Sequence, residues 1–271
     1  MGAASTARTS THASCLSTVD GCDGGRYNNS RRAHFQFEDV KNPFAEGTFR
    51  WVAKARYDEG LRTGQPCAIK WFKSGAVFEH AFFSLDIKAV HKAREIIHEF
   101  NSSRIVNKPI KINMTATWRF DENSGEYAGQ SVLCEPFIEN YQKFNSNSGW
   151  SDDSIPWGKV MQALSHFSFH STGGKYVLCD LQGGIYKREV VLADPVILSR
   201  NREFGVTDLG PEGISAFFCG HTCNLYCRPD WHKPEKPSPS KSFPPVQGTT
   251  MSALSVPTAH SRPDGSSLMP A

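Results

Sequence analysis

The sequence has no long apolar run and no marked excess of charge of either sign. None of its apolar stretches approaches the roughly 18–20 residues that a membrane-spanning helix needs, so we expect no transmembrane segment. Its 30 Lys and Arg residues are nearly matched by 27 Asp and Glu residues, which gives no electrostatic reason to expect a nucleic-acid partner. The opening stretch MGAASTARTSTHAS lacks the apolar core of a secretory signal, and we therefore expect a cytoplasmic protein.

Disulfide-forming patterns are also missing, although the chain has eight cysteines. They are scattered along the chain, which is typical of reduced thiols. The exception is the stretch GHTCNLYC, where His221, Cys223 and Cys227 have the short spacings of metal ligands. A structural zinc site takes four Cys or His ligands, so a fourth ligand must come from elsewhere. His166 and His170 are candidates because both lie in one predicted helix, although either could be an ordinary core histidine.

Both ends of the chain are poor in large apolar residues. Residues 1–33 are rich in Ser, Thr, Gly, Asn and Arg, and residues 232–271 are rich in Pro and Ser. Such segments cannot bury enough apolar surface to offset the entropy lost on ordering, so we predict a disordered tail at each end. The patterned block between them, 34–231, contains no internal repeat and is predicted to form one domain.

The first half of this block is dominated by strand patterns. Alternating apolar residues predict strands, and an apolar period near 3.6 predicts a helix. The expected elements are a hairpin of strands at 50–57 and 67–72, a helix at 85–100, and strands at 110–118 and 130–138.

The second half is more helical. We predict a helix at 155–170, a strand at 176–181, a long loop to LADPVILS, and a helix that Pro211 opens. The pattern favours a strand-rich lobe at about 34–138 and a mixed lobe at about 139–231, with a ligand cleft between them.

Lys70 is the first candidate for chemistry. It lies in the middle of the strand CAIKWF, on the same face as Ala68 and Phe72. An unpaired ammonium is costly to bury, so a buried Lys70 would need a partner such as a nucleotide phosphate. An edge strand that leaves Lys70 in solvent is the simpler interpretation of this stretch alone.

Asp180 is the second candidate, because it ends a buried strand just before a Gly-rich turn. α/β folds place ligand-binding groups at such positions. Gln182 and Asp194 follow, and their oxygens with that of Asp180 would suit Mg²⁺. Taken alone, these turn-like stretches favour ordinary turn and cap roles for both aspartates.

The stretch VTDLGPEG could present backbone N–H groups to an anion at the start of a helix. It is neither a Walker A sequence, since G-K-[ST] is absent, nor a G-x-G-x-x-G sequence. By itself it is a weak indication.

Taken together, these stretches resemble one known family. In order, PFAEGTFR, CAIKWF, CEPFIENYQKFNSNSG, LCDLQGG, ADP, GVTDLGPEGISAFF and HTCNLYC are similar to the alpha-kinases, over roughly 40–228. The resemblance implies an α+β, two-lobed protein-kinase-like fold, with a strand-rich N-lobe and a mixed C-lobe stapled by a structural zinc. The chain lacks the H-R-D, D-F-G and V-A-I-K motifs of the better-known protein kinases.

The resemblance also implies roles in ATP binding. Lys70 would pair with the ATP phosphates, assisted by Arg50. Glu135 would lie on the connection between the lobes, against the adenine. Asn145 and Asn147 would belong to a loop over the phosphates.

Catalytic and substrate roles follow from the same resemblance. Asp180 would be the catalytic aspartate, while Gln182 and Asp194 would hold Mg²⁺. The family's late Gly-rich loop, linked to substrate binding, would contain Gly205, Asp208, Gly210 and Gly213. The segment 183–193 is longer than in better-known members, which puts the placement of Asp194 in question.

The resemblance makes His166 the fourth zinc ligand beside His221, Cys223 and Cys227. With four protein ligands the metal would be structural. The expected function is that of a Mg-ATP-dependent serine/threonine protein kinase acting on a protein substrate. The alternatives are an inactive pseudokinase, which would not need to keep Lys70, and a zinc-containing nucleic-acid-binding protein, which the balanced charge disfavours.

Overall fold

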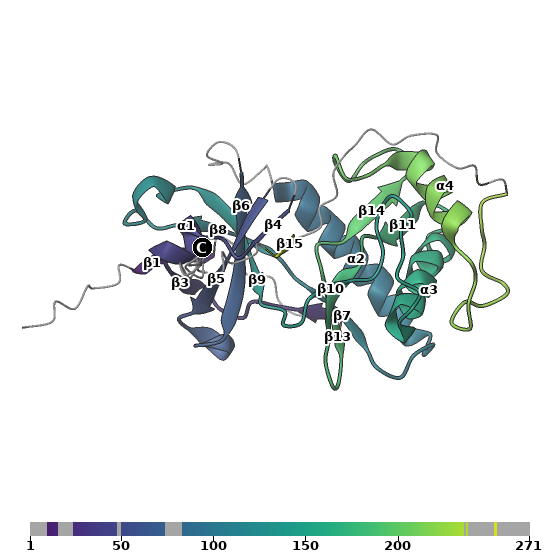
Figure 1. Ribbon diagram of the computed structural model, residues 1–271, viewed down its shortest axis with the longest axis horizontal. Coiled ribbons are helices and arrows are strands. Elements are labelled where there is room, and N and C mark those ends of the chain that lie inside the picture. The colour runs from purple at the N-terminus through teal and green to yellow at the C-terminus, as the bar shows by residue number, and fades with distance from the viewer. Residues whose placement is uncertain are drawn as a thin grey trace, which may run out of the picture.

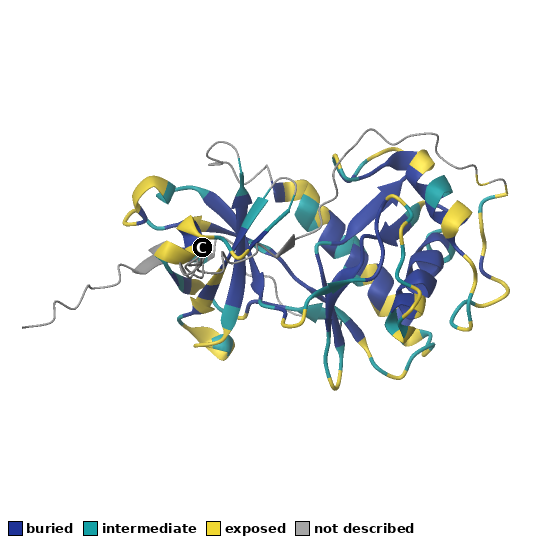
Figure 2. Ribbon diagram, viewed as in Figure 1, coloured by how far each residue is buried: buried dark blue, intermediate teal, exposed yellow. Residues whose placement is uncertain are grey.

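Two lobes, each with its own apolar core, lie side by side in the computed structural model (Figure 1). The structure describes residues 10–15, 24–47, 50–73, 83–235, 237 and 252–253. Within these residues, no helix combines the length and the apolarity needed to cross a bilayer. Dark blue buried segments run through the middle of both lobes, and the exposed residues lie at the periphery (Figure 2).

The first lobe is a strongly curved sheet. Its strand order is β15-β4-β5-β3-β1-β8-β9-β6, and a further pairing of β5 with β6 closes six of the strands into a ring. The strands are β1 (Ser10–Cys15), β3 (Arg32–Gln36), β4 (Ala45–Glu46), β5 (Arg50–Tyr57), β6 (Pro66–Phe72), β8 (Ala116–Phe120), β9 (Ser131–Pro136) and β15 (Ser252–Ala253). The ring encloses Phe35, Tyr57 and Trp118, all nearly inaccessible to solvent. A short helix, α1 (Phe37–Lys41), follows β3.

The second lobe combines two small sheets with three helices. A five-stranded sheet has the order β10-β12-β13-β7-β2, and β11 pairs separately with β14. The strands are β2 (Gly25–Arg26), β7 (Ile110–Asn113), β10 (Gln142–Lys143), β11 (Tyr176–Cys179), β12 (Gln182–Ile185), β13 (Val190–Ala193) and β14 (Val196–Ser199). The helices are α2 (Ser84–Ser102), α3 (Pro156–Ser171) and α4 (Gly210–Gly220).

The predicted strand at 110–118 is two strands in different lobes. Ile110 and Ile112 of β7 pack in the core of the second lobe, whereas Trp118 of β8 packs in that of the first. Alternation continues through the break, so the pattern could not show that the chain changes sheets. With α2 also in the second core, the first lobe is not the continuous segment 34–138 that we predicted.

The segment before LADPVILS, which we predicted to be a long loop, is also regular secondary structure. Residues 182–193 form an antiparallel hairpin of β12 and β13, in which Gln182 lies opposite Ala193. The sequence pattern did not predict this hairpin because it contains Gly183 and Gly184, and Gly is generally depleted in strands.

The N-terminal segment differs from the predicted disordered tail. Residues 25–26 pair in parallel with β7, and Tyr27 and Asn28 are 8% and 6% exposed. One aromatic anchor and backbone pairing stabilise a segment whose overall composition is polar. Most of the remaining residues of both predicted tails lie outside the described residues.

Candidate active site

A cavity of about 390 Å³ lies between the two lobes, and both contribute to its wall. Val52 and Lys70 face it from the first sheet, Leu85 from α2, and Asp194 from the end of β13. A second cavity of about 130 Å³ shares Val52 with it. The smaller cavity is mostly apolar and is lined by Phe44, Ala45, Val52, Ala68, Glu135, Phe137, Ile138 and Tyr141.

Lys70 is buried in a central strand, so the edge-strand interpretation was wrong. β6 pairs with both β5 and β9, and Lys70 is only 2% exposed. Its Nζ lies 2.7 Å from Glu135 Oε1 and 2.5 Å from Asp194 Oδ2. Burial lowers the pKa of Lys70, but Asp194 and Glu135 outweigh this and leave the pKa above its ordinary value. Lys70 therefore remains a cation inside the protein.

Glu135 points its carboxylate at Lys70. Its other oxygen accepts a hydrogen bond from Thr115 Oγ1 at 2.9 Å. Burial raises the pKa of Glu135, and nearby Asp194 raises it further against the opposing effect of Lys70. Two carboxylates share one ammonium here, so this cluster carries an excess negative charge. A cation or a proton would be favoured beside it.

Arg50 connects the first sheet to α2. Its Nη2 donates to Asp86 Oδ2 at 2.5 Å, and Asp86 lies in the first turn of α2. Burial lowers the pKa of Arg50, but the carboxylates of Asp86, Asp194 and Glu135 together outweigh this effect and leave the pKa above its ordinary value. Both residues line the larger cavity.

Asp180 follows β11 and is completely buried. Its Oδ1 lies 2.8 Å from Lys143 Nζ, and its Oδ2 accepts from Gln182 Nε2 at 3.4 Å. The backbone φ angles of Asp180 and Asp194 are 54° and 48°. This left-handed region is unfavourable for residues with side chains and is enriched at functional sites. Both acidic residues are thus held in unusual backbone conformations, and Asp194 lines the larger cavity.

Gln182 and Asp194 could contribute oxygens to a divalent cation. Asp194 directly follows Ala193, the register partner of Gln182 in the β12–β13 hairpin. Among the described residues, Gln182 Oε1 is buried without a hydrogen-bond partner, which is costly unless a ligand satisfies it. This oxygen and the Asp194 carboxylate are ligands that Mg²⁺ accepts. The segment 183–193 forms most of the β12–β13 hairpin, which leads directly into Asp194.

Asn145 and Asn147 hold the loop before α3 in place. Asn145 Oδ1 accepts from Leu181 N at 2.9 Å, and its Nδ2 donates to Ser165 Oγ at 3.0 Å. Asn147 Nδ2 donates to Thr207 O at 3.0 Å. The two side chains therefore connect this loop to the segment after β11 and to the Gly-rich loop.

The four residues of the Gly-rich loop separate into two groups. Gly205 lines the larger cavity. Asp208 is 2% exposed and accepts from Ser199 N at 2.8 Å and Gly210 N at 2.9 Å. At Gly213, an added Cβ would lie 2.7 Å from Leu209 Cβ. Asp208, Gly210 and Gly213 thus shape the loop and the start of α4, whereas Gly205 faces the cleft.

The four predicted metal ligands converge behind this cleft. The ligand atoms of His166, His221, Cys223 and Cys227 all lie within 4.8 Å of one another. Cys223 Sγ lies 3.5 Å from His166 Nδ1, and Cys227 Sγ lies 3.7 Å from His221 Nε2. Ordinary Zn–N and Zn–S lengths at a tetrahedral angle place N and S about 3.6 Å apart. The donor set and its spacing therefore fit zinc.

The surroundings of the cluster also suit a metal. His166 Nε2 lies 3.1 Å from His232 O, the backbone contact that commonly orients a metal-binding imidazole. Burial lowers the pKa of His221 to about 4, so its imidazole is neutral near pH 7. His170 instead stacks on Trp231 and accepts from His232 N at 3.3 Å, which leaves it outside the cluster.

Comparison with known proteins agrees with this geometry. The model of the Alpha-kinase family matches residues 45–227. The chain belongs to the alpha-kinase family. This membership supports a protein kinase function.

The relatives of this alpha-kinase match different lengths of its chain. Alpha-protein kinase 1 of Dictyostelium discoideum is 31% identical over 189 residues, which are 68% of this chain and 13% of that protein. Eukaryotic elongation factor 2 kinase of Mus musculus is 38% identical over 99 residues, which are 35% of this chain and 13% of that protein. The chain thus spans only a small part of the length of these relatives.

Solved alpha-kinase domains share the fold. The inactive alpha-kinase domain of myosin-II heavy chain kinase A, complexed with ATP, superposes with a TM-score of 0.60 at 20% identity. The match covers 83% of this chain and 97% of that one. The mixed helix and sheet architecture is therefore that of an alpha-kinase domain.

Three residues of the alpha-kinase cleft were missed by the sequence analysis. They are Asp86 beside Arg50, Lys143 beside Asp180, and Tyr141 in the smaller cavity. Asp86 and Lys143 looked like ordinary surface charges in a helix and in a polar stretch. Only their ionic partners, distant in sequence, distinguish them.

Proposed function

We propose that the chain is an active serine/threonine protein kinase that transfers the γ-phosphoryl group of Mg-ATP to a protein. The observation that carries this proposal is that Lys70 of the first lobe and Asp194 of the second form an ion pair in the wall of one cleft. Gln182 lies opposite Ala193, the residue before Asp194, and its amide group contacts the Asp180 carboxylate. An inactive binding module would have no use for a buried lysine shared by two carboxylates, nor for an unpaired buried amide oxygen. Protein is the expected substrate, and a cytoplasmic location stays a prediction.

In this proposal ATP spans the two cavities. The adenine would occupy the smaller one, whose walls are mostly apolar and include Phe137 and Ile138 of the connection between the lobes. The phosphates would extend past Lys70 and Arg50, which line the larger one. The ATP complex of the myosin-II heavy chain kinase A domain, which has the same fold, supports a nucleotide in this cleft.

A divalent cation would be held by Gln182 Oε1 and the Asp194 carboxylate. Bound there, Mg²⁺ would supply positive charge to the phosphate oxygens. Lys70 would exchange its contact with Asp194 for the nucleotide, since both the ammonium and the cation are attracted to that carboxylate. The zinc would remain structural.

Asp180 would act on the acceptor hydroxyl. Its carboxylate orients the Ser or Thr hydroxyl and accepts the proton as the hydroxyl oxygen bonds to the γ-phosphorus. The bond from that phosphorus to the β,γ-bridging oxygen breaks, and ADP leaves. Lys143, whose Nζ lies 2.8 Å from Asp180 Oδ1, would orient the carboxylate.

The direct test is phosphate transfer by the purified chain. With radiolabelled ATP, Mg²⁺ and a generic basic protein, we expect labelled acceptor that yields phosphoserine or phosphothreonine on hydrolysis. Nucleotide binding without any transfer would favour the pseudokinase alternative. Label confined to tyrosine would contradict the proposed specificity.

Tyr141 provides a sharp test of the nucleotide position. Within the described part of the chain, its buried hydroxyl has no hydrogen-bond partner, and it lines the smaller cavity. Burial and nearby Asp194 raise its pKa well above the ordinary value, so the phenol remains a neutral donor. Tyr141→Phe is expected to weaken ATP binding about fivefold, the effect of one net hydrogen bond.

Equilibrium titration with ATP would measure this difference. Tyr127→Phe is the matched control, since Tyr127 packs against Trp71 and lines neither cavity. Equal affinities for Tyr141→Phe and the wild type would place the nucleotide away from Tyr141.

A further inference from the structure

A short N-terminal segment, residues 24–28, lies behind the connection between the lobes. It is outside the family match, which begins at residue 45. Figure 1 shows this purple chain reaching β7, with which β2 pairs in parallel. Ile112 N donates to Gly24 O at 3.0 Å, and Met114 N donates to Arg26 O at 2.9 Å. The segment is therefore an integral strand of the second lobe.

The connection between the lobes comprises residues 134–139. Three of its backbone carbonyls accept hydrogen bonds from side chains of the N-terminal segment and of β7. Two of the donors belong to this segment, and the third belongs to its pairing partner β7. The bonds are Asn28 Nδ2 to Cys134 O at 3.0 Å, Asn113 Nδ2 to Pro136 O at 2.7 Å, and Arg26 Nη1 to Phe137 O at 3.0 Å. The path from the last strand of the first lobe to the second is thus fixed at three points.

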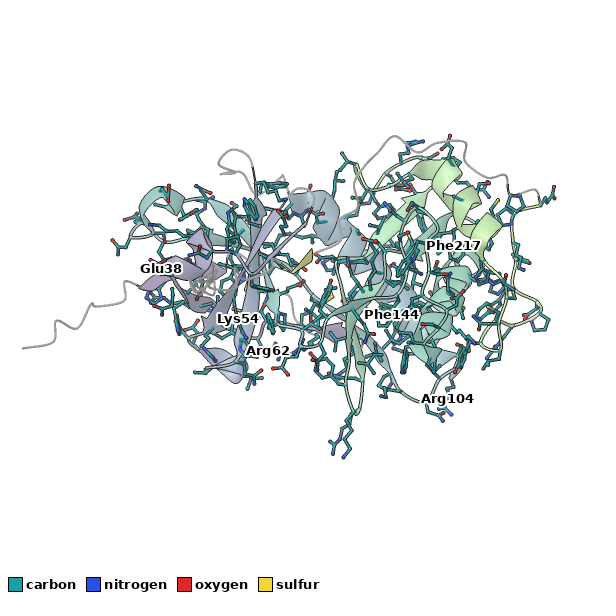
Figure 3. The ribbon with its side chains drawn as sticks, viewed as in Figure 1. Glu38, Lys54, Arg62, Arg104, Phe144 and Phe217 are labelled. Atoms are coloured by element: carbon teal, nitrogen blue, oxygen red, sulfur yellow. The ribbon has the colours of Figure 1, made fainter. Side chains whose placement is uncertain are left out.

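The segment is itself attached to both lobes. The Tyr27 ring packs in the core of the second lobe, and its hydroxyl accepts from Arg94 Nη1 at 3.3 Å. In the first lobe, Tyr57 OH donates to Asn28 Oδ1. Arg62 Nε donates to Tyr27 O at 2.6 Å, and Figure 3 labels Arg62 at the end of the first lobe that faces the second. Movement of one lobe would therefore strain these contacts.

Arg26 lies between the connection, where it donates to Phe137 O, and the ring of Tyr186 near the tip of the β12–β13 hairpin. It is half-buried, and its guanidinium lies 6.0 Å from the centre of the Tyr186 ring. Tyr186 OH in turn accepts from Glu139 N at 3.0 Å. The hairpin tip and the N-terminal segment thus hold the connection together, from Cys134 to Glu139.

We propose that residues 24–28 form a brace that positions the connection for nucleotide binding, with Arg26 as its main positioning residue. The inference rests on the proposed kinase function, because Phe137 and Ile138 of the connection line the cavity assigned to the adenine. A site that is already rigid loses less entropy when it binds its ligand. The brace therefore raises nucleotide affinity without touching the nucleotide.

Arg26→Met in the full chain tests this role. Methionine keeps an apolar stem over Tyr186 but removes the donors to Phe137 O. We expect KM and the equilibrium dissociation constant for ATP to rise about fivefold to tenfold, as for one lost charged hydrogen bond, with kcat changed less than twofold. Arg26→Lys, which restores one donor, is expected to recover at least half of the affinity.

Arg56→Met is the matched control, since Arg56 also donates to a backbone carbonyl, Gly64 O at 3.0 Å, but on the outer surface. Unchanged ATP affinity in Arg26→Met, or an equal loss in Arg56→Met, would overturn the brace while leaving the kinase proposal intact. A lower melting temperature with unaltered affinity would likewise reduce Arg26 to a structural role. Absence of ATP binding in the wild type would remove both proposals together.

Discussion

Replacing Asp180 with alanine is expected to reduce phosphate transfer from ATP by at least about 100-fold, the range of a lost general base. The substitution removes the carboxylate whose Oδ1 lies 2.8 Å from Lys143 Nζ. Asp180 lies in no part of the two apolar cores, so the protein is expected to stay folded. Initial rates with radiolabelled ATP and a basic acceptor protein would measure the loss.

The control for this substitution is Asp121→Ala. Asp121 is also paired with a cation, Arg32 at 3.5 Å, but it lies in the first lobe away from both cavities. Its removal is expected to leave the rate unchanged. ATP binding, measured separately, should survive in Asp180→Ala, because Lys70 and Arg50 remain. Full activity of a folded Asp180→Ala protein would refute the proposed mechanism.

Loss of the zinc site is expected to have the largest effect on stability. Metal analysis should find about one zinc per chain, and Cys227→Ser should lower the free energy of unfolding by about 4 kcal/mol, as is typical when a metal site is lost. For a domain of this size such a loss corresponds to a fall in melting temperature of about 10 °C. The reason is structural, because the ligands connect α3 to the segment after α4.

Cys219→Ser separates this effect from a general sensitivity to cysteine substitution. Cys219 is an exposed free thiol in the same region and is not part of the cluster. We expect the melting temperature and the zinc content of the Cys219→Ser protein to match those of the wild type. At a temperature where Cys227→Ser is still folded, its kcat should be close to normal. A chain that is equally stable without zinc, or a folded Cys227→Ser protein with only a catalytic defect, would contradict a structural role.

Local pattern predicted the longer elements of secondary structure well, whereas most of the short strands were missed. The hairpin of β5 and β6 and the helices α2 and α3 lie where alternation and helical period placed them. The break after Asn113 and the β12–β13 hairpin were missed, since a change of sheet leaves alternation unaltered and Gly-rich strands do not look like strands. The brace was missed for a related reason, because a polar composition does not reveal three specific hydrogen bonds.

The sequence by itself determined the family, through motifs whose order and spacing need no structure, and it determined the three long helices and the longer strands. It also indicated the metal site, because Cys and His residues at short spacing are typical of metal ligands and can be recognised without a structure. The resemblance had already chosen His166 over His170 as the fourth metal ligand, and the structure places His166 in the cluster. Only the tertiary structure decided that Lys70 is buried between Glu135 and Asp194. Burial and ion pairing depend on which distant segments meet, and that meeting is set by the packing of whole strands and helices.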